Sequence, residues 1–382
     1  MTEPSCAACD GPLDDDRRTV SIGGAAVEVC CDACAVALRE AGASGAATPA
    51  RVAVFGAAGH TGRFVMRELA RRGFAVTAVG RDARRLADAG FADGTRLAEA
   101  VLDRPATIDA ALAGAAAAIN CAGPFLDTAE PVVAASLRAR IPYLDVTAEQ
   151  AAALGLFENH AAGARAAGVA VVPAMGFFGG LADLLVTAAC RDWDAADAVR
   201  IGVALDSWHP TEGTRRTGRR NTVPRVTIAD GALRPVPAVA PTATWEFAAP
   251  FGRQEMVGTA LSEAILIAQH LRVGTLGHFL NTVSLRDLQD ADTPAPVAVD
   301  DAGRSAQRFL VEVEVRRGDA VRRASAGGQD IYAVTAPLVA EALSRLIDAP
   351  PAVGGVFAPG ALFDADAFLA SLDPAFLSYR RG

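Results

Sequence analysis

Apolar and polar residues along the chain follow two rhythms, one typical of strands and one of helices. Within residues 51–81, a short β-type run, Val52–Phe55, leads into a glycine-rich turn. The stretch after the turn places Phe64 and Leu69 at helical spacing with arginines between them, and a second β-type run, Ala75–Val79, follows. Strand, glycine turn, helix and strand in this order predict a βαβ unit.

The alternation of strands and helices continues beyond this unit. Further strands and helices are predicted over Leu97–Leu102, Thr107–Leu112, Ala115–Cys121, Pro131–Arg140 and Val169–Pro173. The pattern then changes to β-like alternation with turns over Arg200–Phe251 and Phe309–Arg323, and to an amphipathic helix over Ala336–Ile347. A helix–strand alternation followed by a strand-rich part predicts an α/β protein with a second, mixed domain.

The glycine turn has the spacing of a dinucleotide-binding turn. Gly56 lets the chain turn sharply off the strand, Gly59 lets the backbone approach a pyrophosphate, and Gly62 lets the helix pack closely on the sheet. The helix start then offers N–H groups and a positive dipole end to the phosphates. The residues predicted to contact the cofactor here are Gly56, Ala58, Gly59, His60, Thr61 and Gly62. An ordinary glycine turn of another α/β protein is the alternative.

The end of the second strand bears on which dinucleotide binds. Asp or Glu at this place bonds the ribose 2′-hydroxyl of NAD, whereas Arg pairs with the 2′-phosphate of NADP. Arg81 occupies the place, with Arg84 and Arg85 one turn further on. Asp82 would be the acid of an NAD site if the strand ended one residue later. We therefore expect NADP(H), and NAD(H) stays open as the alternative.

Ligands of open α/β sheets bind beyond the C-terminal ends of the strands. After the fourth strand, the residues predicted to lie along the cofactor near the nicotinamide ribose are Cys121, Ala122, Gly123 and Pro124. Glu149 is the catalytic candidate at these ends, to meet a substrate cation or relay a proton. A helix-terminal acid held by the dipole is an equal alternative for Glu149. Cys121 is expected to be a packed strand-end residue rather than a reactive thiol.

Beyond these strand ends, the strand-rich part offers His209 as a candidate proton donor. A basic stretch follows it, with Arg215, Arg216, Arg219 and Arg220. Such a stretch would grip a carboxylate, a phosphopantetheine phosphate or an acidic carrier protein. A solvated loop is the alternative.

Five of the seven cysteines lie within the first 34 residues. Two Cys-x-x-Cys pairs, the second opening a helical run over Ala35–Ala41, suit a tetrahedral thiolate site for Zn²⁺. A hairpin-like pattern over Thr19–Val29 separates the pairs. The predicted ligands are Cys6, Cys9, Cys31 and Cys34, with Cys30 either as a substitute for Cys31 or as a free thiol. A redox dithiol pair or an iron site is the alternative. The pattern resembles the treble-clef fingers of the YHS and TRASH group.

A second resemblance covers nearly all of residues 50–372. It is carried by the glycine turn, Arg81, and the segments INCAGPF (119–125), YLDVTAE (143–149), VPAMGFFGGLAD (172–183), EGT (212–214), DIYAVTAP (330–337) and GVFAPG (355–360). Together these resemble the saccharopine dehydrogenase-like oxidoreductases, in particular the branch with the trans-acting enoyl reductases. The resemblance implies a doubly wound Rossmann sheet, an inserted mixed α/β second domain and C-terminal helices that return to the first domain.

The domains predicted from both resemblances are a zinc-finger-like module over 1–46, a Rossmann domain over 50–180, a substrate or oligomerisation domain over 181–335, and C-terminal helices over 336–382. Residues 43–49 would link the first two. A homodimer through the second domain is an open option.

Composition narrows the classes of function. The chain has 382 residues, of which 51% are hydrophobic and 21% charged, as in a soluble globular protein. Its net charge of -8 argues against nucleic-acid binding. No signal peptide and no membrane-spanning run is evident, so the cytoplasm is expected. All 36 basic residues are arginine, which excludes a Schiff-base lysine, a P-loop lysine and the Tyr-x-x-x-Lys pair of short-chain dehydrogenases.

The sequence thus predicts an NADP(H)-dependent reductase that transfers hydride to a C=C (enoyl) or C=N bond of a small-molecule or carrier-bound intermediate. Two alternatives remain open. One is a non-catalytic NADPH-binding sensor or scaffold with the finger as a docking module. The other is a metal-handling protein that delivers metal to a partner.

Overall fold

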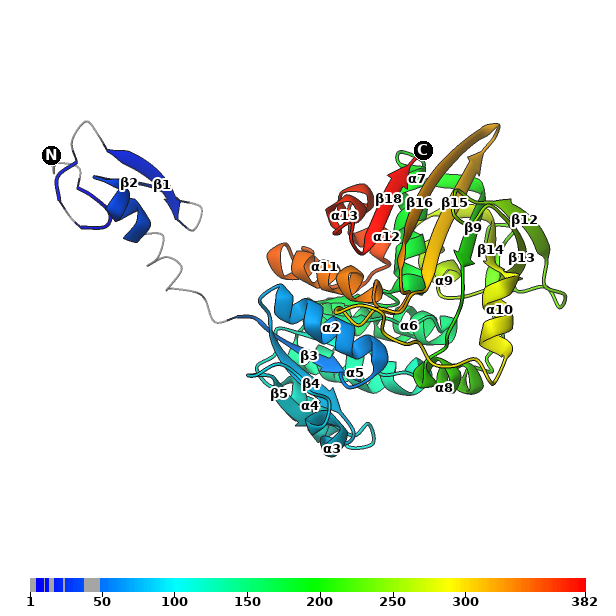
Figure 1. Cartoon of the computed structure of the whole chain (residues 1–382), viewed down its shortest axis with the longest axis horizontal. Coiled ribbons are helices and arrows are strands. Elements are labelled where there is room, and N and C mark those ends of the chain that lie inside the picture. The colour runs from blue at the N-terminus through cyan, green and yellow to red at the C-terminus, as the bar shows by residue number, and fades with distance from the viewer. Residues whose placement is uncertain (1–4, 10, 14–16, 23–24, 38–48) are drawn as a thin grey trace. The chain divides into compact units, whose positions relative to one another are not determined.

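The computed structural model describes residues 5–9, 11–13, 17–22, 25–37 and 49–382 (Figure 1). The chain divides into two compact units, residues 1–50 and 51–382. Part of the helix predicted over Ala35–Ala41, and nearly all of the predicted 43–49 linker, lie outside the described residues.

The first unit is a hairpin followed by a short helix. Strands β1 (Arg18–Ile22) and β2 (Ala25–Val29) pair antiparallel, and residues 32–37 are helical. The buried side chains of this unit include Cys6, Val20, Val29 and Ala35. A core this small does not hold a fold by hydrophobic burial alone, so units of this size usually need a metal or disulfides.

The second unit contains a parallel sheet with the strand order β17-β8-β7-β6-β3-β4-β5. Its strands are β3 (Arg51–Phe55), β4 (Ala75–Gly80), β5 (Arg96–Glu99), β6 (Ala117–Asn120), β7 (Tyr143–Asp145), β8 (Ala170–Val172) and β17 (Gly355–Val356). The order reverses between β3 and β6, which is the switch point of a Rossmann sheet. Strand β17, from the C-terminal part of the chain, extends this sheet beyond β8.

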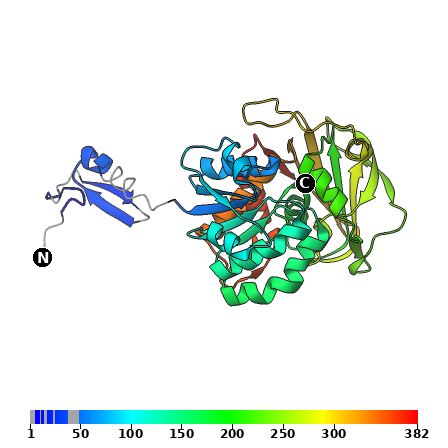
Figure 2. The same cartoon turned by 90° about the horizontal axis from the view of Figure 1, so that it is seen from below.

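Helices cover both faces of this sheet (Figures 1 and 2). They are α2 (His60–Arg71), α3 (Ala83–Ala87), α4 (Pro105–Leu112), α5 (Phe125–Ala139) and α6 (Gln150–Ala167). In β3, Val52 and Val54 enter one hydrophobic cluster, whereas Ala53 and Phe55 enter another. Successive side chains of a strand point to opposite faces, so a strand buried in two clusters has a core on each face. The predicted doubly wound fold is confirmed.

A second sheet is mixed, with the order β12-β13-β14-β9-β15-β16-β18. Its strands are β9 (Ala195–Leu205), β12 (Thr242–Glu246), β13 (Arg253–Thr259), β14 (Arg272–Asn281), β15 (Arg308–Arg317), β16 (Ala320–Gln329) and β18 (Leu377–Arg381). Only the β14–β9 pair of this sheet is parallel. The predicted mixed second sheet is therefore also confirmed.

The remaining elements of the second unit are helices and the two-stranded sheet β10-β11. They are η1 (Phe177–Leu181), α7 (Ala182–Cys190), α8 (Glu212–Arg220), β10 (Val226–Ala229), β11 (Ala232–Pro235), α9 (Glu263–Ile267), α10 (Thr282–Gln289), α11 (Thr335–Asp348), α12 (Pro359–Leu362) and α13 (Ala365–Ser371). Among the helices of the described residues, none combines the length and the apolar composition needed to cross a bilayer.

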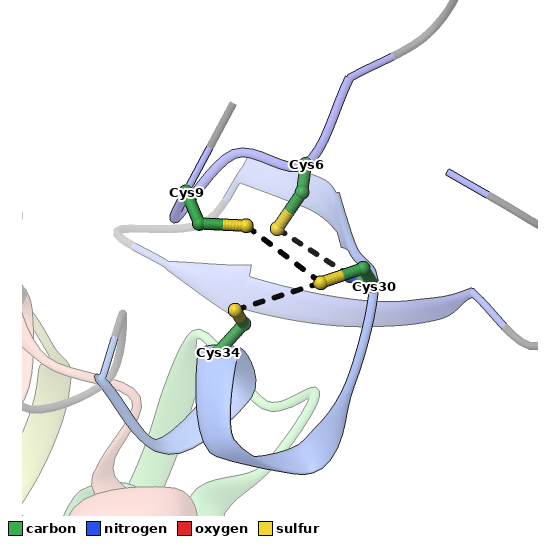
Figure 3. Close-up of side chains that lie close together, drawn as sticks. All are labelled: Cys6, Cys9, Cys30 and Cys34. Atoms are coloured by element: carbon green, nitrogen blue, oxygen red, sulfur yellow. Dashed lines mark hydrogen bonds between the residues drawn. The ribbon is translucent and has the colours of Figure 1, made fainter. Parts of the chain in front are cut away.

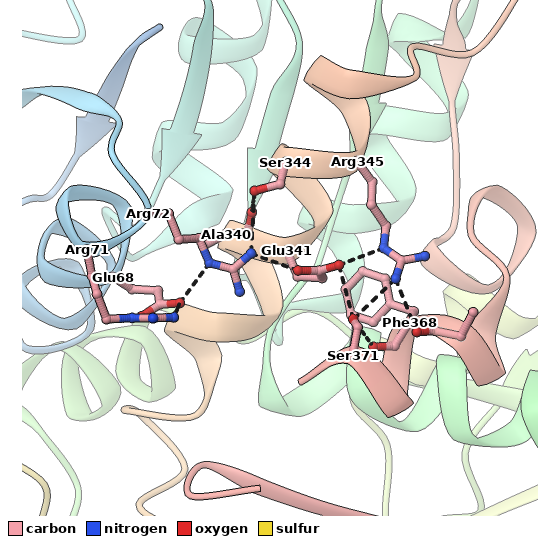
Figure 4. Close-up of polar contacts among 10 residues, drawn as sticks. Glu68, Arg71, Arg72, Ala340, Glu341, Ser344, Arg345, Phe368 and Ser371 are labelled. Carbon is pink, nitrogen blue, oxygen red and sulfur yellow. Dashed lines mark hydrogen bonds and ion pairs between the residues drawn. The ribbon is translucent and has the colours of Figure 1, made fainter. Parts of the chain in front are cut away.

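A partly buried polar network joins the C-terminal helices to α2 (Figure 4). Glu68 of α2 accepts from Arg72, and Arg72 donates to Glu341 of α11 at 2.7 Å. Glu341 also accepts from Arg345 at 2.8 Å and from Ser371 of α13 at 3.1 Å. Segments more than 250 residues apart in sequence are thus joined through charge-assisted hydrogen bonds, which are about twice as strong as neutral ones.

Two elements differ from the sequence predictions. Helix α5 begins at Phe125, not at Pro131, which lies inside the helix. The predicted start at Pro131 is therefore wrong by six residues, although proline is more common in the first helical turn than inside a helix. Residues 212–220, expected within β-like alternation or a loop, form helix α8, whose N-cap Thr211 accepts from the Thr214 N–H at 3.0 Å. A threonine directly before an acid was the available signal for this helix start.

Candidate functional site

The glycine turn between β3 and α2 packs too closely for side chains at two positions. Gly56 has a φ of +73°, and a Cβ on it would lie 2.8 Å from the backbone of Ala122. A Cβ on Gly62 would collide with the carbonyl oxygen of Gly56. The turn is therefore pressed against the loop after β6 on one side and against the first turn of α2 on the other. This close packing fits the roles that the sequence assigns to the two glycines.

Hydrogen-bonding groups at the start of α2 lack partners among the described residues. The helix begins at His60 without a side-chain cap. The His60 Nε2 atom is buried and has no hydrogen-bond partner among the described residues. Burial lowers the pKa of His60, so its neutral ring can present an N–H. Uncapped helix N–H groups beside an orphaned ring nitrogen and a glycine cradle fit the phosphates of a dinucleotide.

The sequence left open whether Arg81 or Asp82 contacts the ribose of the dinucleotide, and the two side chains have different surroundings in the structure. Strand β4 ends at Gly80, and both following side chains are exposed. Asp82 is the N-cap of α3, where its carboxylate accepts from the Arg85 N–H at 3.0 Å. Arg81 forms no ion pair with any part of the chain that the structure describes. The guanidinium is thus the group available beyond this strand, while the carboxylate is engaged in a cap.

Side chains at the end of β6 and in the first turn of α5 hydrogen-bond to the backbone of the loop between them. The Asn120 amide accepts from the Ala122 N–H at 3.0 Å and donates to Tyr143 at 3.2 Å, and Thr128 donates to the Ala122 carbonyl at 2.6 Å. Burial, with a smaller contribution from the Asp145 carboxylate, raises the pKa of Cys121 far above its ordinary range. Cys121 is therefore a neutral, packed thiol at the strand end.

Glu149 caps the start of α5, the helix that follows this loop. Its carboxylate is 1% exposed, and it accepts from the N–H groups of Phe125 at 2.7 Å and Leu126 at 3.2 Å, the first residues of α5. Burial raises the pKa of Glu149, and these two N–H groups oppose the rise. Both oxygens are engaged, so the geometry gives Glu149 a positioning role. Of the two roles considered for Glu149, a catalytic acid or a helix-terminal acid, this arrangement is closer to the second. The carboxylate, however, caps α5 and not α6, the helix that Glu149 itself precedes.

His209 enters a hydrogen-bond cluster through its backbone. Its carbonyl oxygen lies 3.5 Å from the Tyr332 hydroxyl, and its side chain is half-buried. The same hydroxyl is 2.9 Å from Thr214 Oγ1. Neither Tyr332 nor Thr214 is among the site residues predicted from the sequence. Both lie in segments that carry the family resemblance, which was the available signal.

Helix α8 lies against the loop predicted to hold the nicotinamide ribose. A Cβ on Gly123 would be 2.9 Å from Thr217 Oγ1 of α8. Helix α8 has no buried residue, and Arg220 is paired with Asp127 of α5 at 2.8 Å. Arg215 donates to the carbonyls of Asp290 and Thr293. The basic stretch is therefore a surface helix held by polar contacts at the edge of the dinucleotide site.

The cysteine cluster forms a separate site in the first unit (Figure 3). The Sγ atoms of Cys6, Cys9, Cys30 and Cys34 all lie within 4.8 Å of one another. Thiolates about 2.3 Å from one zinc ion in a tetrahedron are about 3.8 Å apart. The Cys9–Cys30 and Cys30–Cys34 sulfur distances of 3.7 and 3.6 Å match this spacing.

The cluster contains Cys30 in place of the predicted Cys31. Cys31 instead precedes the helix at residues 32–37, and its carbonyl accepts from the Ala35 N–H at 3.0 Å. The Cys-x-x-Cys spacing favoured Cys31, but the path of the chain from β2 into the helix turns the Cys30 sulfur toward Cys9. Cys6 Sγ also accepts from the N–H groups of Ala8 and Cys30, the kind of outer bond that orients a metal ligand.

Comparison with known proteins agrees with the dinucleotide site. A family profile described as NAD(P)H-binding matches residues 56–179. The match begins at the glycine turn and ends near η1, so it contains the parallel strands β4 to β8. The chain therefore carries an NAD(P)-binding domain. A search of curated protein sequences found no match.

Solved structures resemble the fold over most of the chain. Apo saccharopine dehydrogenase (L-Glu forming) from Saccharomyces cerevisiae is 13% identical, with a TM-score of 0.59 over 87% of this chain and 100% of that one. GenD2 from gentamicin A biosynthesis, in complex with NAD, is 14% identical, with a TM-score of 0.44 over 88% of this chain and 97% of that one. At this identity the first likeness shows a shared fold alone.

Proposed function

We propose that the protein is an NADP(H)-dependent reductase that transfers hydride to a C=C (enoyl) or C=N bond of a small-molecule or carrier-bound intermediate. The proposal depends on two features that occur together: the glycine turn between β3 and α2, and Arg81 directly after β4. Asp82, which would serve an NAD site, is committed to capping α3. An exposed guanidinium at this place suits the 2′-phosphate of NADP.

In this proposal, the residues of the chain bind and orient the dinucleotide. The first turn of α2 and His60 hold the pyrophosphate, and Gly123 and Pro124 lie along the nicotinamide ribose. Glu149 fixes that loop by capping α5. The bound nicotinamide supplies the hydride. The protein then has to supply position, exclusion of water and a proton for the atom that becomes negative.

The substrate class follows from resemblance. Similarity to the trans-acting enoyl reductase branch favours an enoyl thioester, and the fold shared with saccharopine dehydrogenase favours an imine as the second choice. The four arginines of α8 at the edge of the site suit a substrate that carries a carboxylate or a phosphate. A basic edge on a chain with a net charge of -8 also suits an acidic carrier.

We also propose that the cysteine cluster holds a structural Zn²⁺ in a YHS- or TRASH-like finger. Four thiolates at tetrahedral spacing leave no open coordination position, so the ion would stabilise the fold and would not catalyse. The finger would then act as a docking module. A homodimer through the second domain is the proposed assembly, and light scattering on the purified protein tests it.

Calorimetry followed by turnover tests the reductase proposal. The protein is titrated with NADPH and with NADH, and NADPH is expected to bind more tightly. Loss of NADPH absorbance is then followed with crotonyl-coenzyme A as the enoyl probe and a cyclic imine, 1-pyrroline-2-carboxylate, as the imine probe. Reduction of either probe supports the proposal and selects the bond type. Tight NADPH binding with no oxidation of it by either probe would instead favour the sensor or scaffold alternative.

A further inference from the structure

The segment between α10 and β15 is a surface loop that combines acidic and exposed apolar side chains. Residues 290–303, here called the acidic loop, contain four aspartates and no basic residue. Val297 and Val299 of this loop are 70% and 60% exposed. Exposed apolar residues that are scattered singly are ordinary, whereas two on one loop present a common apolar surface to a partner.

Arginines of the same chain hold the acidic loop at both ends. Arg215 of α8 donates to the carbonyl oxygens of Asp290 and Thr293 at 3.1 and 2.7 Å. Arg67 of α2 donates to the carbonyl oxygen of Ala302 at 2.9 Å. Two prolines between these contacts also restrict the backbone. A loop fixed in this way loses little conformational freedom when a partner binds it.

A groove of the opposite charge lies on the second sheet, over the adjacent strands β9, β15 and β16. Its volume is about 250 Å³. Two rows of residues that lie opposite one another across these strands line it: Arg200, Glu314 and Arg323 in one row, and Ala198, Arg316 and Val321 in the other. The lining thus contains three arginines and one glutamate beside two apolar residues.

The single carboxylate of the groove is already engaged. Glu314 accepts from Arg200 at 3.0 Å and from Arg323 at 2.7 Å. Arg316 is exposed and forms no ion pair within the part of the chain that the structure describes. Val321, which is 40% exposed, gives the groove an apolar wall. Such a groove suits a partner that presents carboxylates next to apolar side chains.

The acidic loop and the groove are complementary, but one chain holds them apart. Ala298 of the loop forms an isolated antiparallel bridge with Ser305, so the loop stays beside the start of β15. Arg316 of the groove lies eight residues beyond Arg308, the first residue of β15. At about 3.3 Å per residue, the strand separates these two positions by about 26 Å. A second chain is therefore needed to bring an acidic loop into the groove.

Two other uses of the acidic loop agree less well with its charge and its valines. As a lid over the dinucleotide site, the loop would place four carboxylates near phosphates, and like charges repel. Helix α8 is basic, but none of its residues is buried, so it offers the valines no apolar recess. The groove on the second sheet provides both the positive charge and the apolar wall.

We propose that two copies of this chain form a two-fold dimer in which the acidic loop of each copy enters the groove of the other. The inference rests on the homodimer proposed above and names its contact surface. Val297 and Val299 pack against Val321, and Asp301 pairs with Arg316. Two-fold symmetry forms this contact twice and closes the assembly. Burial of the valines supplies affinity, and the charges supply specificity.

The first test measures the dimer dissociation constant of the full chain by sedimentation velocity. Val297→Ser is expected to raise this Kd about 10-fold or more, because the burial of a valine at the contact is lost. Val353→Ser is the matched control, since Val353 is 65% exposed but lies outside the acidic loop. Circular dichroism checks that both variants are folded. An unchanged Kd in Val297→Ser overturns the proposal.

The second test exchanges the charges of the proposed pair. Asp301→Arg and Arg316→Glu are each expected to raise the dimer Kd about 10- to 100-fold, because like charges then meet across the contact. A chain that carries both changes restores an ion pair, so its Kd should return close to that of the wild type. A double variant as weak as the single variants overturns the contact between the loop and the groove.

The outcomes also separate this contact from the homodimer on which it rests. A dimer that none of these changes weakens overturns the contact but leaves the homodimer, which then uses another surface. A wild-type chain that stays monomeric overturns both. Assemblies larger than a dimer overturn the two-fold arrangement, because a contact between loop and groove that does not close forms open chains.

Discussion

The Glu149 carboxylate accepts the N–H of Phe125 at 2.7 Å, and this contact sets where α5 begins. The two residues lie 24 positions apart, on different sides of β7. Because the loop predicted to hold the nicotinamide ribose ends at Phe125, the capping carboxylate also fixes that loop. One buried acid therefore connects helix stability with the geometry of the dinucleotide site.

Replacement of Glu149 by Ala is expected to destabilise the protein by about 2–4 kcal/mol, because two buried N–H groups lose their acceptor. Glu149→Gln keeps one acceptor oxygen and is expected to lose about half as much. Urea unfolding measures both values, and NADPH affinity should fall with them. Wild-type stability in the Ala variant would show that the cap contributes nothing.

Arg81→Ala is expected to weaken NADPH binding by about 10- to 100-fold, since a charge-assisted contact with the 2′-phosphate is lost. Binding of NADH, which lacks this phosphate, should not change. Asp82→Asn is the matched control, because asparagine also caps helices well. The reverse pattern, with NADH affinity sensitive to Asp82 and NADPH affinity insensitive to Arg81, would identify an NAD site.

Glu341→Ala is expected to cost about 2–3 kcal/mol of unfolding free energy. The change removes one of the two carboxylates that Arg72 contacts, the other being Glu68, and it leaves Arg345 with the Ala367 carbonyl and Ser371 as acceptors. The site is largely shielded from water, since Arg72 is 18% exposed and Glu341 14%. Arg84→Ala is the control, because its 3.9 Å pair with Asp88 is almost fully exposed and such pairs are worth about 0–1 kcal/mol. Thermal and urea unfolding compare the two, and similar losses would argue against a special role for the network in Figure 4.

The buried pair of His270 and Asp183 makes stability depend on pH. Their side chains are joined at 2.8 Å, and Asp183 also accepts from the Gly360 N–H. Burial lowers the pKa of His270, but the Asp183 charge and hydrogen bond outweigh it, so the pKa is raised. A group with a raised pKa in the folded state stabilises fully below its unfolded pKa of about 6.5. That contribution is lost as pH rises through the folded pKa.

His270→Asn should therefore cost most stability at low pH and progressively less above about pH 6.5. Urea unfolding of both proteins between acid and mildly alkaline pH measures the difference. A difference that stays constant over this range would show that the imidazole does not titrate with folding.

Metal content tests the cysteine cluster. The purified full chain is expected to hold one zinc ion, and Cys30→Ser is expected to lose it because its sulfur lies between Cys9 and Cys34 (Figure 3). Cys31→Ser, its neighbour in sequence, should keep the ion. Zinc is measured by elemental analysis after dialysis. Loss of zinc in Cys31→Ser with retention in Cys30→Ser would restore the ligand set predicted from spacing.

The sequence by itself determined the features that depend on local pattern. Apolar runs separated by helical periods predict the parallel sheet, because burial on both faces needs such runs. The glycine turn is equally local, since its glycines serve a turn and a helix start within seven residues. The position of Arg81 at a strand end follows from the same short-range pattern.

Tertiary structure decided the features that depend on partners distant in sequence. The N–H groups at the start of α5 are accepted by Glu149, which lies beyond β7, and the local pattern placed this helix start too late, at Pro131. The path of the chain after the hairpin brings Cys30, and not Cys31, into the cluster, and the spacing of the cysteines along the sequence does not determine that path. Tyr332 meets Trp208 and Thr214 across more than 100 residues, and no periodicity records that contact. Hydrogen bonds between remote segments form only when the packed sheets bring those segments together, so the tertiary fold decides them.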